Sequence, residues 1–148
     1  MKKFSALSKK LLSLPGVARD NMDSFIDLGK LNPTGRDRGT GFEIGRFKYD
    51  AVISIERFPA KLAEMLLSVL LIWISENDPE RDELGLSEPD IDITPEDEGS
   101  VTVEISIEFD EALTIIRDSS GSIEYDGALW SVGDIEINVA ENLYGIET

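Results

Sequence analysis

The chain has 148 residues, a length that fits one domain, and its 41% hydrophobic and 30% charged residues are typical of a globular protein rather than a disordered one. It contains no cysteine and no histidine. This composition excludes disulfides, thiolate metal sites and catalysis by the commonest general base. The formal net charge is -16 at pH 7, and it is unevenly distributed along the chain.

The charge changes sign between the two parts of the sequence. Residues 1–61 contain 12 Lys and Arg against 7 Asp and Glu, whereas residues 62–148 contain 2 against 23. Because the acidic part would repel a polyanion, nonspecific binding to nucleic acid is excluded. Oppositely charged parts can instead meet between copies of the chain, and head-to-tail contacts of this kind close into rings when the rotation permits.

The N-terminal part predicts two short helices and a flexible connection. Apolar residues at helical spacing predict a helix over residues 3–14. A second helix is expected over residues 22–28, with Asp20 as its N-cap and Gly29 as its end. Residues 30–33 form a brief predicted strand, and the glycine-rich stretch 35–45 is expected to be a polar connection.

The most apolar element is a helix predicted from Pro59 to Asn77, which Asp78 and Pro79 end. Its apolar run is shorter than the roughly 20 residues that a spanning helix needs, so we do not expect a membrane segment. Lys9 and Lys10 interrupt the first apolar positions, which removes a signal-peptide core and leads us to expect an intracellular protein.

This helix is apolar on more than one side, so two surfaces must cover it. One side fits a sheet. The excess apolar residues would pack on the N-terminal helices, which we favour, or on an adjacent subunit; they are Leu67, Leu70, Leu71 and Ile74.

Alternating residues predict the sheet. Strands are expected over residues 47–56 and 101–110, with a short strand at 90–94 and an extension at 113–116. Asp126 and Gly127 predict a type I′ hairpin, and Ile135, Ile137 and Val139 form a last alternating run. We therefore predict one α+β domain over residues 1–148: a mainly antiparallel sheet with a long apolar helix and N-terminal helices packed on one face.

No motif indicates catalysis or a cofactor. Gly39, Gly41 and Gly45 do not have the spacing or the following helix of a phosphate-binding loop. The acidic residues from Asp90 onward fail the EF-hand order, because Pro95 stands where glycine is required. Paired carboxylates could serve a hydrolase, and serine with lysine remains a formal alternative, but the sequence identifies no pair. Trp73 and Trp130 are expected to anchor the core or an interface.

The charged residues beside the glycine-rich stretch and the acidic turn are the candidate contact residues. We expect the cations to approach the acidic residues of a neighbouring copy or another acidic surface. The set comprises Arg36, Arg38, Arg46, Lys48, Glu96, Asp97 and Glu98.

Three segments in this order resemble the tail completion protein R family of contractile-tailed temperate phages. They are FIDLGKL at Phe25 to Leu31, YDAVISIERF leading into the helix that ends WISENDPE, and SVTVEISIEF followed by YDGALW. The resemblance covers the chain from about Phe25 to Tyr144, and its most specific part is the end of the helix, with Trp73 and Pro79.

The resemblance implies a structural protein without catalytic residues or cofactors, which caps the head-proximal end of the tail tube so that a filled head can join. Implied partners are further copies in a ring, which is a hexamer in related tail terminators, together with the tail tube protein and head-tail connector proteins. The implied location is the host cytoplasm during assembly and then the virion tail. The alternative function, which rests on the acidic part, is a small interaction module that mimics DNA or regulates a host protein.

Overall fold

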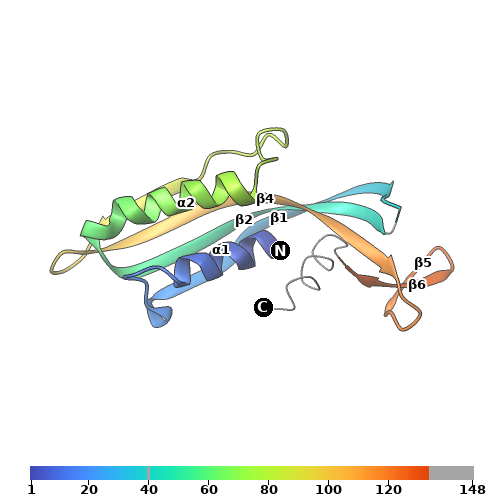
Figure 1. Ribbon diagram of the computed structural model, residues 1–148, viewed down its shortest axis with the longest axis horizontal. Coiled ribbons are helices and arrows are strands. Elements are labelled where there is room, and N and C mark those ends of the chain that lie inside the picture. Colours follow the sequence, from blue (N-terminus) through green and yellow to red (C-terminus); the bar gives the residue numbers. More distant parts are fainter. Residues whose placement is uncertain (40, 134–148) are drawn as a thin grey trace. The chain divides into compact units, whose positions relative to one another are not determined.

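The computed structural model describes residues 1–39 and 41–133 of the chain. Two α-helices, two short 3-10 helices and six strands follow one another in this part of the chain (Figure 1). In order they are α1 (Lys2–Leu12), η1 (Arg19–Asn21), β1 (Met22–Asp37), β2 (Phe42–Pro59), η2 (Ala60–Leu62), α2 (Ala63–Asn77), β3 (Asp90–Pro95), β4 (Ser100–Arg117), β5 (Ile123–Tyr125) and β6 (Ala128–Val132).

The strands form one sheet in the order β1-β2-β4-β6-β5, and β3 also pairs with β4. The β3–β4, β4–β6 and β5–β6 pairs are antiparallel, with Ile93 opposite Val103, Ile115 opposite Val132, and Tyr125 opposite Ala128. The predicted α+β class with a mainly antiparallel sheet and a long apolar helix is therefore confirmed. No helix among the described residues is long and apolar enough to cross a membrane.

The chain folds into two compact units. Unit 1 comprises residues 1–30 and 48–111, and unit 2 comprises residues 31–47 and 112–148. The strands β1, β2 and β4 contribute residues to both. The assignment of residues 1–148 to a single domain stays a prediction.

Unit 1 contains the main apolar core. Alternate residues of β2 and β4 are buried on one face, and α1 and α2 lie over this face and contact each other (Figure 1). Trp73 of α2 lies edge-on to Phe109 of β4, with ring centroids 6.1 Å apart. The buried residues of the two strands are Tyr49, Ala51, Val52, Ile53, Ile55, Phe58, Val101, Val103, Ile105, Ile107 and Phe109.

The long helix divides its apolar residues between the core and the surface. Leu70 and Ile74 are buried, and Leu7 and Leu11 of α1 are fully buried in the same unit. The preference for packing on the N-terminal helix is thus supported for these residues. Leu71, in contrast, is 65% exposed, so its predicted burial within the chain was wrong.

The helical segment begins one residue later than expected, and its first turn is 3-10. Pro59 is the last residue of β2 and has an extended backbone, with ψ 123°. The amide of Ala60 then donates to the carbonyl of Gly99 at 2.8 Å, which fixes the turn into η2. The predicted end at Asn77 is confirmed.

The second predicted helix was wrong, because residues 22–28 belong to β1. Met22, Phe25, Ile26 and Leu28 have helical spacing, but a segment this short fits a strand equally well by periodicity. Pairing with β2 decides the outcome. Gly29, expected as a left-handed helix stop, does not have a positive φ.

The predicted connection at 35–45 was also too long. β1 continues to Asp37 and β2 begins at Phe42, so the two strands are much closer together in the sequence than predicted. The amide of Arg38 donates to the carbonyl of Gly41 at 2.7 Å between them. β4 likewise continues without a break through the predicted extension at 113–116.

The hairpin between β5 and β6 was predicted correctly. Asp126 and Gly127 have φ of 53° and 74°, as a type I′ turn requires at both central positions. Trp73 is buried, whereas Trp130 is half-buried and lies under the guanidinium of Arg117, 5.1 Å from the ring centroid. The last alternating run, Ile135 to Val139, lies outside the described residues.

Candidate assembly surface

The cations of the β1–β2 hairpin surround a buried carboxylate in unit 2. Glu43 is fully buried. One of its oxygens accepts from the guanidinium of Arg38 at 2.5 Å, and the other accepts from the hydroxyl of Thr34 at 2.6 Å. The guanidinium of Arg46 lies 3.9 Å from the same carboxylate. The structure thus brings together two of the predicted contact residues, Arg38 and Arg46. Their positive charges compensate the buried carboxylate of Glu43.

These neighbours keep Glu43 ionised. Burial alone raises the pKa of a carboxyl group. Hydrogen bonds from Thr34 and Arg38 and the positive charges of Arg38 and Arg46 outweigh this effect, so the pKa of Glu43 lies below its ordinary value. Glu43 was missed in the sequence because one acidic residue among basic ones carries no signal of burial.

The close approach of the two strands depends on Gly45. A Cβ atom at this position would lie 2.8 Å from the carbonyl oxygen of Asn32 in β1. Any larger residue would therefore push the hairpin strands apart next to Glu43. Asp37 adds a second local constraint, because its carboxylate accepts from the amide of Gly39 at 2.8 Å.

The other two predicted cations differ from this pair. Arg36 is exposed on β1 and has no ion-pair partner among the described residues. Lys48 belongs to unit 1, where its ammonium lies 3.6 Å from Glu108 of β4. Burial alone raises the pKa of Glu108, but bonds from Ser87 and the charge of Lys48 hold the pKa below its ordinary value.

The predicted acidic residues form the turn between β3 and β4 in unit 1. Glu96 is used within the fold, since its carboxylate accepts from the amide of Arg57 at 2.9 Å and from the hydroxyl of Thr102 at 2.8 Å. Asp97 and Glu98 are exposed. No group of acidic residues in the described part of the chain has the arrangement to hold a metal ion.

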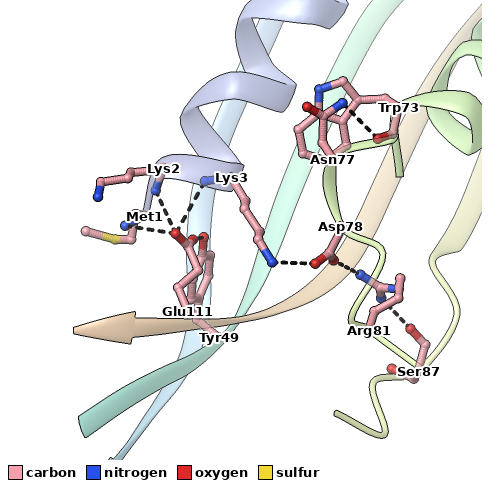
Figure 2. Close-up of polar contacts among 10 residues, drawn as sticks. All are labelled: Met1, Lys2, Lys3, Tyr49, Trp73, Asn77, Asp78, Arg81, Ser87 and Glu111. Carbon is pink, nitrogen blue, oxygen red and sulfur yellow. Dashed lines mark hydrogen bonds and ion pairs between the residues drawn. The ribbon is translucent and has the colours of Figure 1, made fainter. Parts of the chain in front are cut away.

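A buried polar network in unit 1 was not predicted (Figure 2). Asp78 is 1% exposed and follows the last residue of α2. Its carboxylate lies 2.5 Å from the ammonium of Lys3 in α1 and 2.5 Å from the guanidinium of Arg81. Arg81 also donates to the carbonyl of Ser87 at 2.7 Å. The network therefore ties α1 and the segment after α2 to one buried charge.

Glu111 of β4 caps the first turn of α1 (Figure 2). Its carboxylate accepts from the amides of Lys2 at 2.9 Å and Lys3 at 3.4 Å, and from the hydroxyl of Tyr49. Burial, together with this bond to Glu111, raises the pKa of Tyr49. One sequence signal was available: the first turn of α1 contains no acidic residue, so its free amides needed an acceptor from elsewhere.

Comparison with known proteins identifies the family. Residues 1–133 match the family described as P2 phage tail completion protein R (GpR). The chain is also 32% identical over 136 residues to a protein of Haemophilus phage HP1 (strain HP1c1), named "Uncharacterized 19.2 kDa protein in rep-hol intergenic region". The match covers 90% of this chain and 82% of that protein.

No solved structure matches the chain. The family match, in contrast, spans all but the last residues and includes both helices and all six described strands. The chain therefore belongs to the P2 phage tail completion protein R family, a structural family, and its role lies in phage tail completion.

Proposed function

We propose that the protein completes the tail by capping the head-proximal end of the tail tube as a ring of copies, which permits a filled head to join. The observation that carries this proposal is the family match over residues 1–133. Its location would be the host cytoplasm during assembly and then the virion tail, with the tail tube protein and head-tail connector proteins as partners.

The distribution of charge supports contacts between unlike surfaces. Arg36 is exposed, and the side chain of Arg38 remains 48% exposed although it binds Glu43. Asp97 and Glu98 are exposed on the acidic turn. A cap that binds itself head to tail needs two different, complementary surfaces on each copy. The proposed contacts comprise the seven residues Arg36, Arg38, Arg46, Lys48, Glu96, Asp97 and Glu98.

Hydrogen bonds and ion pairs within the chain show which of these residues are suitable for testing a contact by mutation. Arg38 and Arg46 compensate the charge of Glu43, and Glu96 binds Arg57 and Thr102. Changes at these positions would disturb the fold as well as a contact. Arg36, Asp97 and Glu98 are exposed and are the better probes.

Assembly in extracts tests the proposal. Purified protein is added to an extract of phage-infected cells that lacks this gene product, and infectious particles and tail lengths are measured. We expect the natural protein to restore normal tails and the R36E variant to restore far fewer. The variant K10E, which reverses an exposed charge on α1, is the matched control and should restore tails fully.

A variant in which the charges of both surfaces are reversed distinguishes a contact between copies from a contact with the tail tube. Combining R36E with D97K and E98K restores a contact between copies but not a contact with a tail tube of unchanged charge. Full activity of R36E alone would contradict the charge contact. Failure of the natural protein to restore tails would contradict the capping role itself.

A further inference from the structure

The strands β1 and β3 each lie at an edge of the sheet, and the two edges differ in character. Within the described residues, β1 pairs only with β2 and β3 pairs only with β4, so each has one open edge. Open edges invite pairing with other strands unless they are short, charged or interrupted by proline. The two edges can be compared directly on these criteria.

The β3 edge has all of these protections. It has six residues, ends at Pro95 and follows Pro89. Its face opposite Ile91 and Ile93 carries Asp90 and Asp92. A second acidic strand would place like charges opposite each other, so this edge does not favour pairing with β3 of another copy.

The β1 edge is less protected over its first ten residues, which contain no proline and only three charged residues, Asp23, Asp27 and Lys30. β1 is 16 residues long, and its only proline is Pro33. Phe25 is 52% exposed, Leu28 is 66% exposed and Leu31 is 72% exposed. Three large apolar side chains on an open strand edge indicate a surface that binds another strand.

The spacing of these residues makes the edge complementary to itself. Phe25 and Leu31 are each three residues from Leu28, so an antiparallel pairing centred on Leu28 places Phe25 of one copy opposite Leu31 of the other. Leu28 then lies opposite its own equivalent on the other face. Asp27 lies opposite Gly29, so no carboxylate lies opposite a carboxylate in this register.

We propose that two copies of the chain pair antiparallel along β1, with Leu28 of one copy opposite Leu28 of the second copy. A single pair of strands contributes few side chains to an interface, so we expect the pairing to depend on protein concentration. It is an isologous contact and differs from the head-to-tail contact of a ring. The inference does not depend on the tail role.

Disulfide trapping tests the register, because the natural chain contains no cysteine. Residues directly opposite each other in an antiparallel pair have Cβ atoms about 4.5–5.5 Å apart, close to the distance that a disulfide needs. We expect L28C to form a covalent dimer at least about tenfold faster than I93C, the control on the β3 edge, because pairing raises the effective thiol concentration.

A mixing experiment fixes the centre of the pairing. F25C and L31C should cross-link with each other much faster than either variant cross-links with itself. Equal rates for all of these variants would overturn the proposal. Cross-linking of L28C with I93C in preference to itself would also overturn it, since that result would mean that β1 pairs with β3 of the next copy.

The natural chain supplies a measurement that does not depend on the variants folding. Amide hydrogen exchange of β1 is compared at low and high protein concentration. Slower exchange in residues 24–32 at high concentration, with β3 unchanged, is the expected result. Exchange in β1 that does not depend on concentration would overturn the proposal.

Discussion

Among the described residues, each unit of the protein buries one carboxylate, but the partners of the two carboxylates lie at different distances along the chain. Glu43 in unit 2 is bound by Thr34, Arg38 and Arg46, all within nine residues of it. Asp78 in unit 1 is bound by Arg81, three residues away, and by Lys3, 75 residues away. Glu43 therefore orders a local hairpin, whereas Asp78 holds separate elements of the sequence together.

The largest expected effect comes from introducing a carboxylate into the apolar core, where it would have no partner. Leu70 on α2 is 2% exposed in the core of unit 1. The variant L70D should lose more than about 4 kcal/mol of unfolding free energy and leave unit 1 unfolded, because the buried charge is uncompensated. Circular dichroism and urea unfolding measure this loss.

The matched control for this variant is L71D, at a position that is 65% exposed. It should change the unfolding free energy by less than about 1 kcal/mol. If L70D were a folded monomer of natural stability, Leu70 would belong to an interface between subunits and not to the core.

Removing the charge of Asp78, which binds Lys3 75 residues away, should cause the second largest loss of stability. D78N should destabilise unit 1 by about 3–5 kcal/mol, because Arg81 stays in a buried site without its counterion and Lys3 loses its ion pair. Urea unfolding followed by tryptophan fluorescence measures the loss. N77A, at the exposed neighbouring position, should cost far less; an equal loss would show that the end of α2, and not the buried charge, is responsible.

Removing the local carboxylate should have a smaller effect. E43Q should cost about 1–3 kcal/mol, because Arg38 and Arg46 can both reach water when the charge is lost. Amide exchange should accelerate in residues 34–46 and stay unchanged in α1. E124Q in β5 is the control, and faster exchange in α1 of E43Q would contradict the local role of Glu43.

The smallest predicted effect is a dependence on pH. The pKa of Glu43 in the folded protein lies below its ordinary value of 4.5, so its ionised form stabilises the fold above this value. The contribution is lost as the pH falls through the lower pKa of the folded state. The difference in stability between the natural protein and E43Q should therefore be constant near pH 7 and shrink below about pH 4.5. A difference that grows in acid would contradict this assignment.

Alternation and helical spacing predicted the elements that form the core. The strands around Ile53 and Ile105 and the helix ending at Asn77 were found because each buries one face, and burial imposes a period on the sequence. The segment at Phe25 was misassigned because β1 is exposed on both faces, so no period was imposed on it. Its strand conformation is fixed by pairing with β2, which the local sequence pattern does not show.

The polar contacts were less predictable than the fold. Arg38 and Arg46 were selected for their charge, but the sequence does not show that Glu43 is buried between them. Asp78 was interpreted as the end of a helix, which is correct, while its bond to Lys3 depends on how α1 and α2 are packed. Pairings over such separations follow from tertiary structure, which local patterns do not encode.

The cap that Glu111 provides links the stability of α1 to a distant part of the chain. The carboxylate that binds the amides of Lys2 and Lys3 in α1 is 109 and 108 residues further along the chain. An isolated helix of 11 residues is marginal in water, so α1 needs its packing in unit 1 and the cap from Glu111 to be stable. We therefore expect the folding of α1 to be coupled to the formation of β4, although the two elements lie far apart in the sequence.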